Sequence, residues 1–245
     1  MNKLTKQKLV AFAILLLVCN YAIAQDKVAS WDFPIKPGTE KWKQLETETE
    51  RLNVLQIPDN ILEVIETEEL VISCLNYPAS IHYTAYDNQF VGFQKVVANF
   101  NGLQELLSRN DAGRYLVEHY NNAGADGFIT KDDRLDGRYW TVKFTYLELM
   151  VSQKEIIQNL EAEERMILLE TTLNKLDIKT HNNDVFSKYD DMNSALIVAR
   201  ILECNNVSAI VSNSVYMDFA SNQVLPDYKT VKEIIELGKT HIGTH

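Results

Sequence analysis

Four ring-bearing side chains with polar tips stand close together between two apolar stretches: Tyr77, His82, Tyr83 and Tyr86. Tyrosine offers rigid contact area and a hydrogen-bonding end, which is the chemistry of a recognition surface. Such a density of rings is unusual for a connection between helices and favours a binding role for these four residues. The alternative is structural, with the rings covering and sealing the ends of the two flanking helices.

Oxygen-bearing side chains between Asn122 and Asp133 have the spacing of calcium ligands. With Asn122 at position 1 of a twelve-residue loop, Asp126 falls at position 5, Thr130 at 9 and Asp133 at 12. The stretch resembles an EF-hand or dockerin loop over these residues only. A glycine at position 3 supplies no ligand, and an aspartate ends the loop in place of glutamate, so a calcium site here would be weak. The alternative is an Asp-Gly turn with solvated acids.

Motifs that would name a reaction are absent from the sequence. It has no nucleophile elbow, phosphate-binding glycine loop, HExxH helix or CxxC pair. We therefore predict no catalytic residue, and calcium is the one candidate cofactor. Paired carboxylates stay open, because the separation of two acids is a property of the folded chain. The sequence favours a non-enzymatic binding module, with a carboxylate-dependent hydrolase and a weak calcium-binding module as alternatives.

The first 24 residues have the organisation of a secretory signal peptide. A basic start from Lys3 to Lys8 precedes an apolar run from Leu9 to Val18, and small residues from Ala22 to Ala24 precede Gln25. The apolar run is shorter than the ~20 residues that a membrane span needs. Cys19 suggests a lipoprotein as an alternative, but the residue before it is a valine and not a small one. We expect cleavage near Ala24 and Gln25.

Export and acidity restrict the partners. Loss of residues 1–24 removes three lysines and no acids, which takes the formal charge from -10 to -13. Such a chain is a poor partner for nucleic acid or anionic lipid. We expect a secreted, periplasmic or cell-envelope protein without a membrane span, and an extracellular or envelope protein or glycan as its partner. Cys74 and Cys204 could pair after export, but their apolar surroundings favour two buried thiols.

Apolar residues recur every three to four positions through most of the chain, and none of it alternates as a strand does. We predict an extended leader over 25–38 and one all-helical domain over 39–245. Its helices, about ten of them, would stack as hairpins in a solenoid-like superhelix or an irregular bundle. A polar, glycine-rich loop near 121–138 would protrude.

Helix starts can be predicted from their capping residues. Thr39 should cap a helix that runs to Leu55, and Thr67 should cap an apolar helix that ends near Pro78. Asp87 or Asn88 should cap the next helix, which carries Phe90, Phe93, Val97 and Phe100. A long helix should run from Tyr139 to Leu160.

Part of the first half of the chain resembles a known group of proteins. The segments KPGTEKWKQL, IPDNIL, LNYPASIHYTAYDNQ and FNGLQELLSR are similar to a group of secreted all-helical proteins from Bacteroidetes-type bacteria. The resemblance implies an exported helical protein, and it carries no activity and no functional residues.

Overall fold

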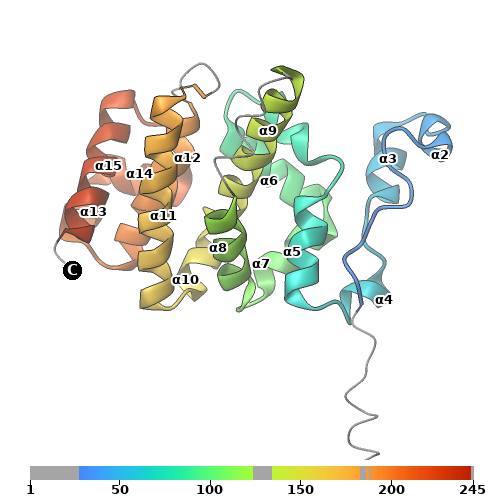
Figure 1. Ribbon diagram of the computed structural model, residues 1–245, viewed down its shortest axis with the longest axis horizontal. Helices are drawn as coiled ribbons and strands as arrows, with labels where there is room; N and C mark the ends of the chain where they lie inside the picture. The colour runs from blue at the N-terminus through green and yellow to red at the C-terminus, as the bar shows by residue number, and fades with distance from the viewer. Residues whose placement is uncertain (1–27, 124–133, 183–185, 188, 244–245) are drawn as a thin grey trace, which may run out of the picture.

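The computed structural model describes residues 28–123, 134–182, 186–187 and 189–243. These residues form fourteen α-helices, ten of them seven residues or longer, and contain no strand. The prediction of an all-α fold is confirmed. The helices follow one another as a row of packed layers, with the N-terminal helices at one end and α15 at the other (Figure 1).

The first helices are shorter than the capping pattern predicted. They are α2 (Glu40–Lys43), α3 (Glu48–Val54), α4 (Asp59–Leu62) and α5 (Thr67–Leu75). Thr39 caps α2 as predicted, because its hydroxyl accepts a hydrogen bond from the Trp42 amide. The prediction of one helix up to Leu55 is wrong: Thr47 and Glu50 form a capping box that begins a second helix.

The aromatic connection contains a helix of its own, the 3-10 helix η1 (Ser80–Ala85). It leads into α6 (Gln89–Asn99), α7 (Asn101–Ser108) and α8 (Ala112–Asn122). Asn88 caps α6, as predicted, by accepting from the amides of Phe90 and Val91. The capping role predicted for Thr67 is wrong. Glu66 takes the N-cap position of α5, and the Thr67 hydroxyl donates instead to Asp111.

The middle of the chain forms α9 (Arg134–Val151), α10 (Lys154–Asn159) and α11 (Ala162–His181). The prediction of one helix reaching Leu160 is wrong, since the chain breaks between α9 and α10 at Ser152 and Gln153. Both residues are buried, and each bonds back to the carbonyl of Leu149. Of the loop predicted near 121–138, residues 121–122 belong to α8 and residues 134–138 belong to α9, so the prediction of a loop is wrong at these two ends.

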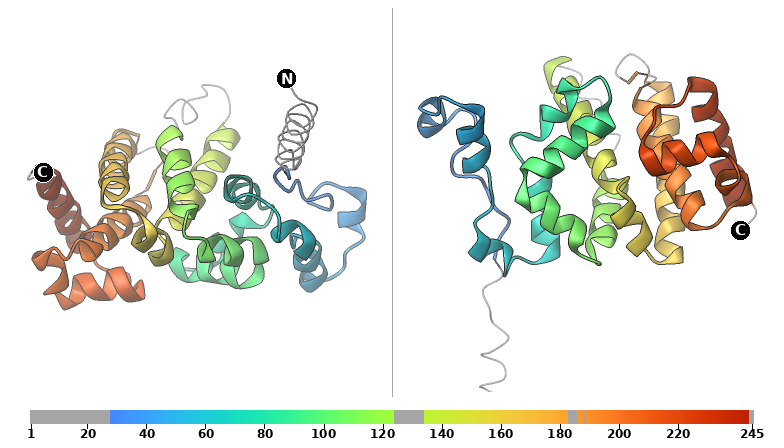
Figure 2. Two further views of the ribbon diagram at one scale, coloured as in Figure 1. Left: turned by 90° about the horizontal axis from the view of Figure 1, so that it is seen from below. Right: turned by 180° about the vertical axis from the view of Figure 1, so that it is seen from behind.

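The last four helices include one, α12, that is buried along most of its length. They are α12 (Asp190–Cys204), α13 (Ser208–Val211), α14 (Ser214–Asn222) and α15 (Tyr228–Ile242). Every residue from Met192 to Leu202 is buried, as expected for a helix that is covered on all sides. Its neighbours are α9, α11, α14 and α15 (Figure 2). The start of α12 therefore lies between the middle and the end of the row.

The described part of the leader, from residue 28, is fixed to the body by aromatic packing. The ring of Phe33 lies 5.9 Å from the rings of both Tyr77 and Phe100, which are stacked 3.9 Å apart. The Trp31 amide donates to the Ser73 hydroxyl of α5. The leader thus covers the end of α5, and Tyr77 belongs to this cluster.

Buried or half-buried cations from one helix bind the free carbonyls at the end of another. Each helix leaves its last carbonyls without partners inside the helix, and a cation near them is favoured by the helix dipole. The pairs join Arg109 to Leu62 and Ile65, Lys143 to Leu75, Lys175 to Asn121 and Ala123, Arg165 to Leu160, and Arg200 to Ser152 and Ala220. Successive layers are therefore tied through main-chain atoms as well as through apolar packing.

Neither of the two described cysteines forms a disulfide. Cys74 is buried, as expected, and burial raises the pKa of its thiol. Cys204 is half-buried. Within the described ranges, no helix combines the length and the apolar character needed to cross a bilayer.

Candidate functional site

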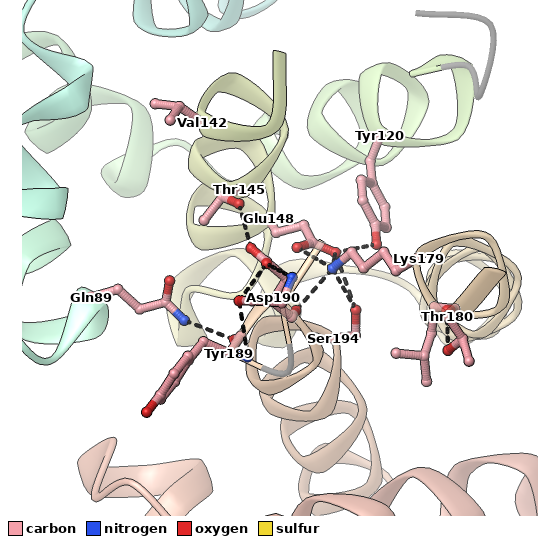
Figure 3. A network of polar contacts seen from close by, with 12 residues as sticks. Gln89, Tyr120, Val142, Thr145, Glu148, Lys179, Thr180, Tyr189, Asp190 and Ser194 are labelled. Atoms are coloured by element: carbon pink, nitrogen blue, oxygen red, sulfur yellow. Dashed lines mark hydrogen bonds and ion pairs between the residues drawn. The ribbon is translucent and has the colours of Figure 1, made fainter. Parts of the chain in front are cut away.

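A closed network of charged and hydroxyl groups lies between α8, α9, α11 and α12. The Glu148 carboxylate of α9 and the Lys179 ammonium of α11 are 2.6 Å apart, and their side chains are 0% and 1% exposed. The Tyr120 hydroxyl donates to the same carboxylate at 2.9 Å, and Ser194 donates to it at 3.2 Å. Figure 3 shows the four side chains converging on one point.

Helical spacing accounts for the position of each partner. Lys175 and Lys179 are four residues apart on α11, so both lie on one face of that helix. Lys175 binds the carbonyls at the end of α8, while Lys179 reaches Glu148. The aliphatic part of each lysine side chain packs in the protein interior, and its ammonium group donates to oxygen atoms.

Burial sets the protonation behaviour of this network. It raises the pKa of Glu148, against the opposing attraction of Lys179. It also raises the pKa of Tyr120, and the nearby charge of Glu148 acts in the same direction. Tyr120 therefore stays a hydrogen-bond donor. A buried ion pair with all its hydrogen-bond partners in place rigidifies its surroundings. Loss of one partner leaves a buried charge with neither a counter-charge nor solvent around it.

Asp190 joins the closed network to an open cleft. Its backbone carbonyl accepts from the Lys179 ammonium at 3.0 Å. Its carboxylate faces the other way and accepts from the Thr145 hydroxyl at 3.3 Å and the Ser187 amide at 2.7 Å. In Figure 3, Asp190 lies between the Glu148–Lys179 pair and Thr145. The network thus holds the first turn of α12 in place from behind.

The cleft itself has a volume of about 360 Å³ and lies between η1, the start of α6, α9 and the start of α12. This is within the range of small-molecule sites. Tyr83 lies at its inner wall, where its hydroxyl donates to the Val142 carbonyl. Tyr86 and Tyr189 stand at its mouth and are 43% and 70% exposed. Rings therefore border the cleft on more than one side.

The remaining lining mixes polar and apolar side chains. Asp87 and Asp190 contribute carboxylates, and Gln89 contributes an amide that donates to the Tyr189 carbonyl. The hydroxyls of four further residues surround these groups: Thr84, Thr141, Thr145 and Ser187. The apolar side chains of Val142, Met192 and Leu225 complete the surface. Polar groups beside rings and apolar side chains suit a ligand that carries both polar and apolar groups.

The four aromatic residues predicted to bind do not form one exposed surface. Tyr77 and Tyr83 are 1% and 3% exposed, whereas His82 and Tyr86 are exposed. Tyr77, His82 and Tyr86 line a small hollow of about 70 Å³, and Tyr83 and Tyr86 line the larger cleft. The alternative interpretation, in which the rings cover the ends of the flanking helices, therefore applies to Tyr77, whose ring is stacked in the core.

The predicted calcium ligands are largely outside the described residues. Asn122 is the last residue of α8, and Asp126, Thr130 and Asp133 lie beyond the described part of the chain. Across the described ranges, no group of three or more metal-binding side chains is found. The calcium loop stays a prediction, and unequal melting temperatures in calcium and in a chelator would support it.

Sequence reasoning missed Glu148, Lys179 and Asp190. Glu148 is a lone acid in the apolar run from Phe144 to Val151, and such an acid must find a partner once the helix is buried. That signal was present. The identity of the partner was not, because Lys179 is 31 residues away in the sequence.

No family model matches this chain, and no curated protein and no solved structure shows significant similarity to it.

Proposed function

We propose that the chain is an exported, non-enzymatic binding module that holds a protein segment or a surface glycan in the cleft between η1, α9 and α12. One observation carries this proposal: the cleft of about 360 Å³ has two exposed tyrosines, Tyr86 and Tyr189, at its mouth. Exposed rings cost little conformational entropy on binding and provide both apolar and hydrogen-bonding contact.

The rigidity of the cleft supports the same role. Gln89 donates to the Tyr189 carbonyl, and Asn88 donates to the Gln223 carbonyl, so the start of α6 is bonded to two segments more than ninety residues away in the sequence. The closed network fixes Asp190 from behind. A preformed site loses less freedom when a ligand enters and binds more tightly for that reason.

Binding should be measured against two probe sets, an array of defined surface glycans and an extract of envelope proteins. We expect at least one ligand to be retained by the wild type and by the control Val64→Ala, an exposed apolar residue in the turn after α4 that does not line the cleft. Tyr86→Ala and Tyr189→Ala should each weaken its binding about tenfold or more, as for aromatic anchors in other interfaces. Equal retention by all four proteins, or no ligand in either set, would contradict the proposal.

A carboxylate-dependent hydrolase is the second candidate, because Asp87 and Asp190 both line the cleft. Against it, the Asp190 carboxylate already accepts from the Ser187 amide, the Ser187 hydroxyl and the Thr145 hydroxyl. These three bonds occupy acceptor positions that a catalytic carboxylate needs for its substrate or water. Release of new reducing ends from the arrayed glycans, abolished by Asp87→Asn, would favour the hydrolase.

A further inference from the structure

The side chains of the cleft combine aromatic faces with negative charge. Three tyrosines line it, two of them exposed, together with the carboxylates of Asp87 and Asp190. The face of an aromatic ring is the negative part of its quadrupole and attracts a cation placed over it. The rings and the carboxylates of the cleft therefore both favour a cationic ligand.

The charge behind the cleft does not cancel this preference. Glu148 is compensated by Lys179 within the closed network, so among the described residues Asp87 and Asp190 are the charged side chains that line the cleft. The described residues that line the cleft include no lysine, arginine or histidine. Burial raises the pKa of the Tyr83 hydroxyl at the inner wall; a hydrogen bond with Thr145 opposes this, and the charges of Asp190 and Glu148 act in the same direction as burial.

Other ligand classes fit the same surface less well. An anion would meet two carboxylates in a partly enclosed space, where like charges repel more strongly than in water. A neutral ligand would gain from the rings and hydroxyls and nothing from the charge. A compact ammonium group with alkyl substituents uses all of these features, because it presents both positive charge and apolar surface.

We propose that the cleft recognises an alkylammonium group, with its charge facing Asp87 and Asp190 and its alkyl surface against Tyr86 and Tyr189. This inference rests on the proposed function and names the chemistry of the ligand. Both kinds of partner can supply such a group: a protein through a lysine side chain, and a surface glycan through an amine or a choline substituent.

Matched pairs of probes test the charge directly. Choline is compared by calorimetry with 3,3-dimethylbutan-1-ol, which has the same shape and no charge. A short lysine peptide is compared with the same peptide acetylated at the lysine Nζ. We expect the charged member of at least one pair to bind about tenfold more tightly, and its affinity to fall with added salt. The pair that responds identifies the source of the group.

Variants locate the binding in the cleft. Asp87→Asn and Tyr189→Leu should each weaken the charged probe about tenfold, while Tyr189→Phe, which keeps the ring, should retain most of the affinity. Glu118→Gln, which removes an exposed acid of α8 outside the cleft, should bind as the wild type does. Lys188 follows Ser187 in the chain and lies outside the described residues. Lys188→Gln should bind the charged probe at least as tightly as the wild type.

Different failures are distinguishable. If neutral and charged probes bind equally, or no charged probe binds below ~10 mM, the ammonium inference is wrong. The binding module still stands in that case if Tyr86→Ala and Tyr189→Ala abolish retention of an arrayed ligand. Tenfold weaker binding of the charged probe by Lys188→Gln would also overturn the inference. If retention of every ligand is unaffected by the cleft variants, the proposed function and the inference both fail.

Discussion

Two polar regions meet at Asp190, one closed and one open. In the closed network, Glu148 and Lys179 satisfy each other and exclude solvent. In the cleft, two carboxylates lie beside exposed rings. The first region stabilises the fold and fixes the position of α12, and the second offers exposed rings and negative charge to a ligand. Substitutions should separate these two roles.

Breaking the closed network should have the largest effect. Lys179→Met leaves the Glu148 carboxylate buried without its counter-charge, and we expect a loss of about 3–5 kcal/mol in the free energy of unfolding. The double variant Glu148→Leu with Lys179→Met should recover much of that loss, since an apolar pair can replace a buried ion pair. Urea unfolding measures both. A loss below about 1 kcal/mol for the single variant would show that the ion pair is accessible to solvent.

Gly92→Ala should destabilise the wall of the cleft. A Cβ atom at Gly92 would lie 2.2 Å from the Tyr83 carbonyl oxygen, so α6 and η1 would have to separate. We expect a cost of about 1–3 kcal/mol, as for overpacking elsewhere. Gly243→Ala is the matched control, because its Cβ would meet ordinary contacts at 3.6 Å or more. Equal melting temperatures for both variants would contradict the close approach.

Asp190 belongs to both regions, so Asp190→Ala should affect both properties. It removes the acceptor of the Ser187 amide and the Thr145 hydroxyl, at a cost of about 1.5–3 kcal/mol. It should also weaken binding of the charged probe about tenfold. Asp190→Asn keeps one acceptor oxygen and should recover stability more than binding. If Asp190→Ala loses only one of the two properties, the cleft and the network are not joined through this residue.

Tyr189→Ala should have the smallest effect on stability. Its side chain is 70% exposed, and we expect a change within about 0.5 kcal/mol. Thermal melting tests this, with Val215→Ala, another exposed residue at 52%, as the control. A clear drop in melting temperature for Tyr189→Ala alone would mean that the ring supports the fold and is not reserved for a ligand.

Local chemistry could be predicted from the sequence, and distant pairing could not. Thr39 and Asn88 were predicted as caps because each bonds within three residues of itself. The prediction that Thr67 caps α5 was wrong because its hydroxyl donates to Asp111, 44 residues away. Arg200 reaches the carbonyl of Ser152 where α9 ends, a contact invisible in the apolar periodicity that predicted one helix.

The candidate site shows the same limit. The loop around Tyr83 and Tyr86 was singled out from its rings, and both residues do line the cleft. Asp190, Tyr189 and Thr145 were not singled out as a site, because they become neighbours of that loop only when α9 and α12 pack beside it. The exposure of each ring could not be predicted from the sequence either. Tyr77 and Tyr86 lie in similar sequence surroundings, yet the Tyr77 ring is stacked in the core and the Tyr86 ring is exposed at the mouth of the cleft.

The cations that bind carbonyls across helix layers have a consequence for dissection of the molecule. The carbonyls of Leu160 and Ser152, which end the middle helices, are held by Arg165 and Arg200 from helices that come later in the chain. A fragment cut after α10 would keep those carbonyls and lose both guanidinium groups. Shortened versions of this protein should therefore fray at the cut, and the whole row is the smallest unit worth expressing.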